Sequence, residues 1–472
     1  PAFLLSIAAT AAILTARWRP EGTTHALLRG ALALSVRTSL ATSPIVLWTF
    51  GSLPLLGVLA NVVLVPLGSA LLVLSALHSL LVCVATPAAL LTTWLLTTGS
   101  RAFLAGCDAF ASTGPSVAWP VLDAWQGAAA CVCAALALLA REVRVALVVL
   151  AIGAALLLGL ELHLRAVEQP HDELRVTFLD VGQGDAALID LPDGHSLLVD
   201  AGGNPEGGAD PGARVLLPLL RARRRDHLDL AVLSHPHPDH YGGFASLLAA
   251  LPVRELWDSG QAEGEASLDG TSHVAAQLLA TARVHGTRVK APGELCGHAR
   301  AFGAARIDVL WPCPSYDAGY DPNDNSLVLR VRYGAHTFLF TGDIEAHAEQ
   351  ALLASGVDLH ADVLKVAHHG SHTSSSAAFL RAVSPRLAVI SAGAVNRFGH
   401  PHADVVQRLQ AVAQTVVDLG KTGGVIVRSD GHDLSLAGND LERTVRSCAL
   451  PQMTPLTSER RPASPSSDRG SP

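Results

Sequence analysis

The chain has 472 residues and a formal net charge of −7, with only 16% charged residues, and its mean hydropathy of +0.34 is unusual for a soluble protein of this length. The length predicts roughly two or three domains. The negative charge excludes a protein that coats nucleic acid through bulk charge, although it permits a local basic groove. Apolar residues are concentrated before about residue 170, so we expect a membrane-embedded part followed by a water-soluble part.

Six apolar segments predict an α-helical polytopic membrane domain over residues 1–165, with about five or six transmembrane helices. They cover residues 3–16, 26–50, 53–84, 90–110, 121–139 and 143–160. The 53–84 segment exceeds one span, so it predicts either a long tilted helix or a helix broken at Pro66. Asn61 in that segment either lines a channel or hydrogen-bonds a neighbouring helix. Arginines flank the segments on both sides, so the positive-inside rule does not decide which side the next domain occupies.

The chain begins at Pro1 without a methionine and enters an apolar helix directly. We therefore expect it to be a fragment of a longer protein, with no signal peptide to interpret. The multi-pass pattern favours a membrane protein.

After a predicted polar linker at residues 166–173, the pattern changes to short strands and amphipathic helices. We expect an α/β domain over residues 174–450 and a disordered tail over residues 451–472, which is rich in Pro and Ser. Strands are predicted at residues 175–179, 186–190, 196–200, 228–233, 253–257, 306–311, 326–331, 336–340, 363–367, 386–390, 415–419 and 424–428, and helices at residues 214–221, 244–250, 345–354 and 403–412.

The most informative stretch follows the apolar strand 228–233 and carries three histidines and one aspartate within six residues. His235 and His237 can face the same way from an extended loop, while Asp239 and His240 turn toward a second point. Zinc and similar divalent ions take imidazole nitrogen and carboxylate oxygen as ligands. An isolated H-x-H is more often a surface turn, but the complete H-x-H-x-D-H between a buried strand and two glycines predicts a metal site.

Residues that can bind metal recur after later predicted strands. Asp343 follows one strand, the pair His368 and His369 follows the next, and His400 lies in a still later loop. Several strand-to-loop junctions that all offer His or Asp are expected of a site along one edge of a sheet sandwich.

These motifs resemble those of a known family. Asp200 in L-V-D-A-G, the H-x-H-x-D-H loop, T-G-D at 341–343 and the later histidines resemble, in order, the metallo-β-lactamase superfamily, whose fold is an αββα sandwich with two divalent metal ions, here zinc or manganese. The stretches F-L-D-V-G-Q-G-D (178–185), N-D-N-S-L-V-L (323–329), K-V-A-H-H-G-S (365–371) and G-H-P-H (399–402) are similar to the C-terminal domain of ComEC-type competence proteins. Residues 40–51 and 57–66 resemble the membrane competence domain of that family.

The resemblance implies a role for each matching residue. His235 and His237 would hold one metal, Asp239 and His240 the second, Asp343 would bridge them, and His400 would be the last metal histidine. His368 or His369 would protonate the leaving oxygen, with Lys365 nearby and Asp239 at the reacting centre. The supporting or substrate-contacting residues are expected to be Asp200, Asp180, Asp185, Asn325 and Ser371.

The pattern departs from the superfamily at one point. Many of its hydrolases carry a further metal histidine between the H-x-H-x-D-H loop and the bridging aspartate. The histidines of that interval here are His273, His285, His298 and His336, and none lies at a strand end beside glycine, although His336 opens a predicted strand. Either the first metal keeps an open position, or Asn325, Ser326 or His368 substitutes. Metal occupancy and identity are therefore left open.

Three further features each have two interpretations. Cys296 and Cys313 either form a disulfide in an oxidising compartment or remain free thiols. The 371–376 stretch either caps the next helix or binds phosphate. A basic run either contacts a DNA backbone or is simply solvated; its members are Arg221, Arg223, Arg224 and Arg225.

The family resemblance implies DNA uptake during natural transformation, by a bacterial inner-membrane channel for single-stranded DNA whose metal-dependent nuclease domain degrades the strand that is not imported. The expected partners are DNA, membrane lipid, other DNA-uptake proteins and a second copy of the chain as a homo-oligomer. A first alternative is a membrane-anchored hydrolase of a small ester or phosphoester. A second is a metal-stabilised structural or gating domain without turnover.

Overall fold

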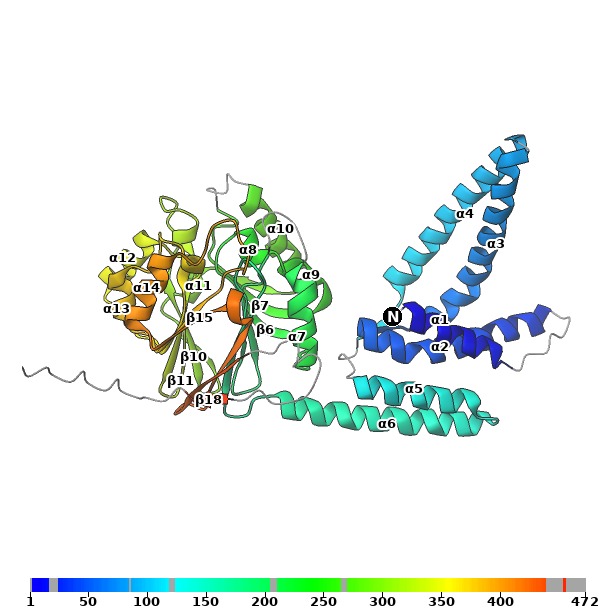
Figure 1. The fold of residues 1–472 in the computed structure, drawn as a ribbon, viewed down its shortest axis with the longest axis horizontal. Coiled ribbons are helices and arrows are strands. Elements are labelled where there is room, and N and C mark those ends of the chain that lie inside the picture. The colour runs from blue at the N-terminus through cyan, green and yellow to red at the C-terminus, as the bar shows by residue number, and fades with distance from the viewer. Residues whose placement is uncertain are drawn as a thin grey trace, which may run out of the picture. The chain divides into compact units, whose positions relative to one another are not determined.

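The computed structural model describes residues 2–16, 24–84, 86–118, 124–203, 210–264, 270–438 and 453–455. The chain divides into two compact units, Pro1–Leu164 and Arg165–Pro472. Helices dominate the first unit, and the second contains two large sheets with helices (Figure 1).

The first unit contains the helices that the apolar segments predict. They are α1 (Ala2–Leu14), α2 (Thr24–Phe50), α3 (Gly57–Val84), α4 (Thr86–Thr113), α5 (Ala124–Leu139) and α6 (Val143–Glu168), with a short antiparallel pair of strands, β1 (Ser52–Pro54) and β2 (Ser116–Ala118). α3 continues through Pro66, so the structure has the long helix of the two alternatives. α6 extends to Glu168, into the segment where the sequence predicts a linker.

Three helical segments of the described residues are long and apolar enough to cross a membrane, namely Arg29–Phe50, Gly57–Val82 and Val143–Glu168. Phe3–Leu14 and Trp125–Leu139 are apolar but shorter. These segments identify a membrane protein, and the larger number of about five or six spans stays a prediction.

The second unit contains two mixed sheets. The first has the order β18-β17-β16-β3-β4-β5-β6-β7-β8, and the second has the order β15-β14-β13-β12-β11-β10-β9. The first sheet consists of β3 (Leu174–Phe178), β4 (Ala187–Asp190), β5 (Ser196–Val199), β6 (Leu228–Leu233), β7 (Val253–Asp258), β8 (Arg288–Lys290), β16 (Val425–Ser429), β17 (Leu434–Gly438) and β18 (Met453–Pro455). The second consists of β9 (Arg300–Phe302), β10 (Ala305–Trp311), β11 (Val328–Tyr333), β12 (His336–Phe340), β13 (Val363–Lys365), β14 (Leu387–Ile390) and β15 (Thr415–Asp418).

Helices cover the outer faces of the two sheets (Figure 1). A π-helical turn (Gly212–Leu216) leads into α7 (Leu217–Ala222), and further helices are α8 (Pro238–Tyr241), α9 (Phe244–Ala250), α10 (Gly270–Val284), α11 (Pro292–Leu295), α12 (Ala346–Ser355), α13 (Ala377–Val383), α14 (Ala403–Val412) and α15 (Leu419–Thr422). This αββα arrangement is the fold class that the sequence predicts.

The apolar core has three layers because the central strands are apolar on both faces. Val232 of β6 lies in the core between the sheets, whereas its neighbour Leu233 packs in the layer under α7–α10. A third layer lies under α12–α14 and includes Leu339 of β12. Alternate side chains of a strand point to opposite faces, so strands covered on both sides appear as unbroken apolar runs.

Several elements were missed by the sequence analysis. α10, α11, α15, β8, β9 and β17 lie in segments for which no element was predicted. The expected tail at 451–472 lies outside the described residues except for β18, which pairs with β17. Cys296 and Cys313, which follow α11 and β10, form a disulfide across 17 residues, so the structure contains the paired alternative.

Candidate metal centre

The ends of parallel strands bring the predicted metal-directed residues to one edge of the sandwich. In the first sheet, β5 runs into Asp200 and the parallel β6 runs into the loop that begins at Ser234. In the second sheet, the parallel strands β12 and β13 lead to Asp343 and to the histidine pair 368–369. Carboxyl ends of parallel strands meet at the same sheet edge, so residues far apart in sequence converge there.

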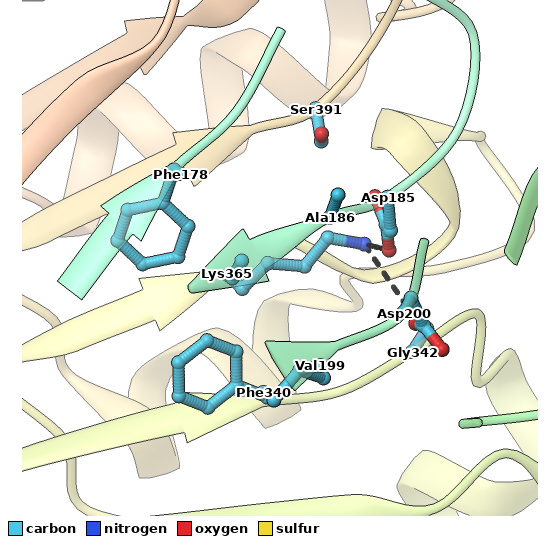
Figure 2. A pocket seen from close by; sticks show the side chains of 10 residues that line it. Phe178, Asp185, Ala186, Val199, Asp200, Phe340, Gly342, Lys365 and Ser391 are labelled. Carbon is cyan, nitrogen blue, oxygen red and sulfur yellow. Dashed lines mark hydrogen bonds and ion pairs between the residues drawn. The ribbon is translucent and has the colours of Figure 1, made fainter. Parts of the chain in front are cut away.

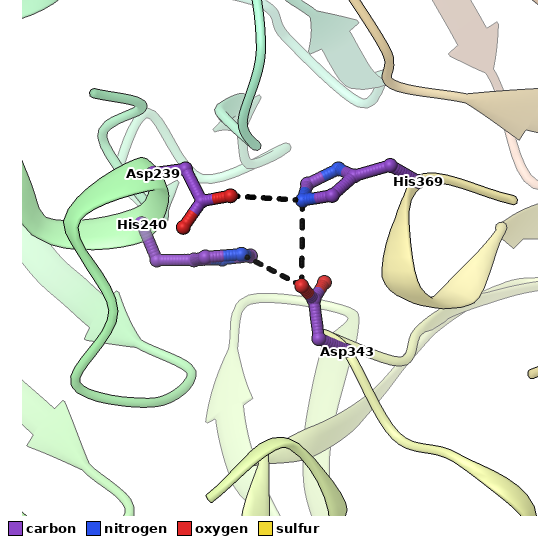
Figure 3. Close-up of side chains that lie close together, drawn as sticks. All are labelled: Asp239, His240, Asp343 and His369. Atoms are coloured by element: carbon purple, nitrogen blue, oxygen red, sulfur yellow. Dashed lines mark ion pairs between the residues drawn. The ribbon is translucent and has the colours of Figure 1, made fainter. Parts of the chain in front are cut away.

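Four side chains form what we call the metal cluster: Asp239, His240, Asp343 and His369 (Figure 3). Their ligand atoms all lie within 4.8 Å of one another. Asp343 Oδ2 is 3.2 Å from His240 Nε2 and 3.3 Å from His369 Nε2, and His369 Nε2 is 3.4 Å from Asp239 Oδ2. Asp343 therefore lies between groups from the H-x-H-x-D-H loop and from the later histidine pair.

Both histidines of the metal cluster are held by the ring nitrogen that faces away from it. His240 Nδ1 lies 2.9 Å from Asp200 Oδ2, and His369 Nδ1 lies 2.7 Å from the carbonyl oxygen of Ser391 and 3.3 Å from Asp185 Oδ1. Donation of Nδ1–H to a carboxylate or carbonyl leaves Nε2 with its lone pair toward the cluster. This is the usual support of a metal-binding imidazole, and Asp200 occupies the supporting position that the sequence predicts.

Unpaired buried atoms show that the metal cluster is chemically incomplete. His240 Nε2, His369 Nε2 and Asp343 Oδ1 are buried and make no hydrogen bond to any described residue. Buried polar atoms without a partner are costly and rare in folded proteins. A divalent cation would satisfy all three atoms, and imidazole and carboxylate are the donors that such ions accept, so these residues fit the metal that the fold implies.

The electrostatics of the metal cluster favour added positive charge. Burial by itself lowers the pKa of a histidine, but the carboxylates of Asp343 and Asp200 raise the pKa of His240 well above its usual value. Asp343 and Asp185 raise the pKa of His369 in the same way. Burial would raise the pKa of Asp343, yet His369 and His240 hold it well below its usual range. A metal ion competes with protons for these ligand atoms.

His235 and His237 form a second pair of potential ligands beside the metal cluster. His235 Nε2 and His237 Nδ1 face each other at 3.0 Å, and the His235 ring lies 4.2 Å from the ring of His240. Burial, assisted by the neighbouring His240, holds the pKa of His235 well below its usual value. A neutral imidazole is the form that binds metal.

Lys365 lies beneath the site, where Figure 2 shows it among the residues that line a small pocket. Its ammonium donates to Asp185 and, at 3.4 Å, to the carbonyl oxygen of Gly342. Burial by itself would raise the pKa of Asp185, but Lys365 is the main cause that lowers it. The Asp185–Lys365 pair therefore supports His369 from behind, and Lys365 is 4.0 Å from Asp343 Oδ1.

The D-V-G-Q-G-D turn is tied directly to the metal loop. The Asp185 N–H donates to the carbonyl oxygen of Asp239 at 3.1 Å. At Gly184, with φ of +126°, a Cβ atom would lie 2.3 Å from that same oxygen. Only glycine permits this approach, which explains the glycine of the motif and keeps Asp185 beside His369.

The backbone of the histidine pair is unusual. His368 and His369 both adopt left-handed conformations, with φ of 47° and 54°. Such conformations cost free energy for residues other than glycine and cluster at functional sites. They direct the two neighbouring side chains to different partners: His369 is 1% exposed within the metal cluster, whereas His368 Nδ1 lies 2.9 Å from Glu345 and its Nε2 lies 3.9 Å from Asp343 Oδ2.

His400, the predicted last metal histidine, is outside the metal cluster in this structure. Its half-buried ring packs 6.2 Å from the ring of His369 and 5.7 Å from that of His368. Burial and the neighbouring histidines lower the pKa of His400 to about 4. The structure therefore brings His369, which was expected as a proton donor, into the position expected for His400.

The substitutes considered for the missing motif histidine differ in their surroundings. The Asn325 amide donates to the carbonyl oxygen of Asp317 and its Oδ1 accepts the Asp317 N–H, so this buried side chain holds its own loop. Ser326 Oγ accepts the Asp343 N–H at 3.1 Å and so lies beside the metal cluster.

Two other predicted residues are not brought to the metal cluster. Asp180 is exposed and accepts the Gly182 N–H within its own turn. Ser371 is buried, and its hydroxyl pairs with Thr373 Oγ1 at 2.9 Å. Of the 371–376 stretch, Ser376 accepts the Phe379 N–H at the start of α13, which confirms the capping alternative for that residue.

The basic run does not form a DNA-binding surface in this structure. Arg223, Arg224 and Arg225 are 4–8% exposed. Arg225 Nη2 lies 2.7 Å from Asp190 Oδ1, and Arg175 Nη2 lies 2.8 Å from Asp190 Oδ2. Buried guanidiniums paired with a carboxylate cannot track a phosphate backbone, so that prediction is corrected to a structural role. Arg221 is half-buried at the end of α7.

Sequence reasoning missed three residues that support the site. Ser391 accepts from His369 through its carbonyl and donates its hydroxyl to Gly184. Glu345 pairs with His368, and Ser234 donates its N–H to Asp200 at 2.8 Å. Ser391 and Ser234 directly follow β14 and β6, so the signal that could have found them was their position at a strand end.

Two families match the chain, one in each unit. Residues 1–144 match the family described as competence protein, and residues 179–394 match the metallo-beta-lactamase superfamily. Among solved structures, that of unliganded yeast PDE1 aligns with 52% of this chain and 97% of its own, at 9% identity and a TM-score of 0.32; a likeness of this size supports no conclusion about activity.

Several bacterial proteins each match about half of this chain. ComE operon protein 3 of Bacillus subtilis is 31% identical over 267 residues, which cover 54% of this chain and 33% of that protein. Competence protein ComA of Neisseria gonorrhoeae is 35% identical over 259 residues, covering 55% and 33%. Recombination protein 2 of Haemophilus influenzae is 31% identical over 253 residues, covering 54% and 28%. The chain spans about a third of the length of these relatives.

The order of the two matches agrees with the two units of the structure, a helical unit with candidate membrane spans and an αββα unit with a buried His/Asp cluster. The chain therefore belongs to the competence proteins of the ComEC and ComA type, with a competence segment followed by a metallo-beta-lactamase domain.

Proposed function

We propose that the second unit is a metal-dependent phosphodiesterase that cleaves DNA, and that the whole protein acts in DNA uptake. The observation that carries the proposal is the metal cluster, in which buried Nε2 atoms of two histidines point at one carboxylate without a hydrogen-bond partner. A structural metal needs such ligands too, but it does not need half-exposed histidines beside them. His368 and His400 supply that second feature.

We assign the ligands of two divalent ions from the donor atoms. His235 and His237 would hold the first ion, Asp239, His240 and His369 the second, and Asp343 would contact both. When bound, zinc or manganese would act as a Lewis acid toward the phosphate and lower the pKa of water. Asp200 and Asp185 would keep the two ligand imidazoles oriented.

His368 is the best placed proton donor for the leaving oxygen. Its Nδ1 contacts Glu345, so its Nε2 is the atom that faces the centre, 3.9 Å from Asp343 Oδ2. Glu345 would hold the ring in this orientation, and a positioned imidazole is an effective general acid. Lys365 is buried against Asp185 and acts behind the ligands rather than on the substrate.

DNA is the proposed substrate because the relatives carry competence and recombination in their names. We propose that the first unit forms part of the path of a single strand through the bacterial inner membrane, and that other DNA-uptake proteins and a second copy of the chain are its partners. On this proposal the second unit degrades the strand that is not imported.

The test uses the full chain in detergent micelles, with labelled single- and double-stranded DNA and added Mn²⁺ or Zn²⁺. Cleavage that needs metal and is lost in Asp239→Asn is expected. The matched control is Asp180→Asn, because Asp180 is exposed near the same edge and lies outside the metal cluster. Hydrolysis of bis(p-nitrophenyl) phosphate without cleavage of DNA would indicate a small phosphoester as substrate, and bound metal without any turnover would indicate a structural or gating domain.

A further inference from the structure

The loop between β14 and α14 exposes an aromatic side chain beside the metal centre. Phe398 is 43% exposed, and it is the one exposed Phe or Trp among the described residues from 174 to 438. Val395 of the same loop is 96% exposed. Large apolar side chains that a domain leaves in solvent are informative when they lie next to a reactive site.

Phe398 belongs to a series of rings that leads to the metal cluster. The Phe398 ring lies 5.6 Å from the His400 ring at an interplanar angle of 20°, and the His400 ring lies 6.2 Å from the His369 ring at 30°. His369 is itself a member of the metal cluster. The exposed ring is therefore two ring-to-ring steps from the place where the proposed reaction occurs.

A positive charge accompanies this ring. The guanidinium of Arg397 lies over the Phe398 ring, 4.8 Å from its centroid. A guanidinium is planar as well as cationic, so the Arg397–Phe398 pair offers two interactions at once, stacking with a planar ligand and attraction to an anion. Nucleotides of a single strand carry both a planar base and a phosphate.

Hydrogen bonds of Asn396 hold the base of the loop that carries Phe398. Asn396 donates from Nδ2 to the carbonyl oxygens of Gly393 and His400, both at 2.8 Å, and its Oδ1 accepts the His400 N–H at 3.0 Å. These hydrogen bonds close the loop across its own base. The exposed part of the Phe398 ring, between Asn396 and His400 in the chain, can therefore contact a ligand while these hydrogen bonds hold the loop.

We propose that Arg397 and Phe398 form a base-stacking site for single-stranded DNA, with the adjoining phosphate directed to the metal centre. The proposal rests on the proposed function and extends it to strand preference. A base in a duplex is stacked on its neighbours and paired, so only an unpaired base presents a face to this site. Base–aromatic stacking tolerates any sequence because every base has a π-face.

The experiment separates stacking from catalysis. Binding of fluorescent oligothymidylate, and of the same strand with abasic positions, is measured by anisotropy with the full chain in detergent micelles, at fixed salt and without added metal. Phe398→Ala, Phe398→Trp and Val395→Ala are compared with the wild type. Hydrolysis of bis(p-nitrophenyl) phosphate with added metal is measured for the same proteins, because that substrate reports on the metal centre without a nucleobase.

Phe398→Ala is expected to raise the Kd for oligothymidylate about five- to a hundredfold, the range that the loss of one stacked base gives. Affinity for the abasic strand and hydrolysis of the small diester should remain unchanged. Phe398→Trp should restore binding, and Val395→Ala, a change at a more exposed apolar side chain of the same loop, should have no effect. Arg397→Ala is expected to weaken both strands and to reduce the salt dependence of binding.

An unchanged Kd in Phe398→Ala, or an equal loss on the base-carrying and abasic strands, would overturn the stacking site while leaving the phosphodiesterase standing. A protein that hydrolyses the small diester but does not bind single-stranded DNA would overturn it too. Conversely, selective binding of base-carrying strands by a protein that hydrolyses no phosphodiester would support the site and reject the proposed enzyme.

Discussion

Two groups of charged side chains are buried at opposite ends of strand β4, and their polar atoms differ in the partners that they find. At one end the arginine cluster, which we define as Arg175, Arg223 and Arg225 around Asp190, has both Asp190 oxygens hydrogen-bonded to guanidiniums. At the other end Asp185 precedes β4 and reaches the metal cluster. There the Nε2 atoms of both histidines and Asp343 Oδ1 lack hydrogen-bond partners among the described residues.

The difference shows how a structural charge cluster can be told from a functional one. Burial would raise the pKa of Asp190, but Arg175 and Arg225 lower it, so the carboxylate is compensated within the chain. The metal cluster holds its carboxylates in the charged form through histidines that could bind a metal just as well. The unpartnered atoms of the metal cluster are imidazole nitrogens and a carboxylate oxygen, which can bind a metal, whereas the unpartnered atom of the arginine cluster is Arg223 Nε, which cannot.

Asp258, at the end of β7, is a third buried carboxyl and has no strong cationic partner. Its Oδ2 accepts the Gly260 N–H at 2.8 Å, and its Oδ1 has no hydrogen-bond partner among the described residues. Burial raises the pKa of Asp258 to about 7. Asp190, Asp343 and Asp258 are thus all buried, but they differ in the cationic groups that surround them. Variants of the three residues test that comparison.

Removing the central carboxylate of the metal cluster should have the largest effect. Asp343→Asn is expected to lower metal-dependent hydrolysis of bis(p-nitrophenyl) phosphate by about a thousandfold or more, because Asp343 lies between His240 and His369 and would help to hold both proposed ions. Initial rates and metal content by mass spectrometry check this. A rate within a few-fold of Asp180→Asn, with metal retained, would contradict the ligand assignment.

Removing the anion of the arginine cluster should damage stability instead. Asp190→Asn is expected to lower the free energy of unfolding by about 3–5 kcal/mol, since it leaves buried guanidiniums without their counter-ion. Urea unfolding followed by tryptophan fluorescence measures the loss, and metal content of the folded protein should not change. Asp226→Asn is the matched control, because Asp226 is 61% exposed where it pairs with Arg165 and should cost no more than about 1 kcal/mol.

Because the pKa of Asp258 is raised, its contribution to the free energy of unfolding should fall as the pH rises. An ion-paired aspartate has the opposite effect. The folded-state pKa of Asp258, about 7, lies above the ordinary aspartate value of 3.8, so the folded protein holds a proton that the unfolded chain releases. This contribution to stability is complete below pH 4 and is lost as the pH rises to 7.

Asp258→Asn should therefore become more stable than the wild type as the pH rises, by roughly 4 kcal/mol between pH 4 and 7. Thermal unfolding of both proteins across that range measures the difference, which cancels the titration of all other groups. A difference that stays constant with pH would show that Asp258 is ionised in the folded protein at low pH.

Asp200 tests the support of a ligand rather than the ligand itself. Asp200→Asn keeps the shape of the side chain but weakens the contact with His240 Nδ1, so metal affinity should fall about 10- to 100-fold. Competition with a fluorescent chelator measures the affinity. Full metal binding by the variant would mean that the Ser234 hydroxyl, 3.2 Å from His240 Nδ1, and the surrounding core suffice to hold His240.

The smallest effect is expected at His400. His400→Ala should change metal affinity by less than about threefold, under 1 kcal/mol. His369→Ala, in contrast, should abolish binding of the second ion. The same chelator competition compares the two variants. Loss of metal in His400→Ala but not in His369→Ala would reverse the assignment of the last ligand.

Sequence alone determined the two-part organisation, the fold class and most candidate site residues. Long apolar segments can be recognised without tertiary information because they exceed what a soluble core needs. The H-x-H-x-D-H loop and T-G-D end buried strands, and strand ends meet at one sheet edge, so Asp239, His240 and Asp343 could be placed together from local signals.

Tertiary structure alone decided which later histidine enters the metal cluster. His368 and His369 are adjacent and chemically identical, and only their left-handed backbone sends one to Asp343 and the other to Glu345. It also decided that Arg223 and Arg225 are structural, because their counter-ion Asp190 lies more than thirty residues earlier in the chain. Local sequence carries no information about such partners, since burial and pairing arise only when distant strands come together.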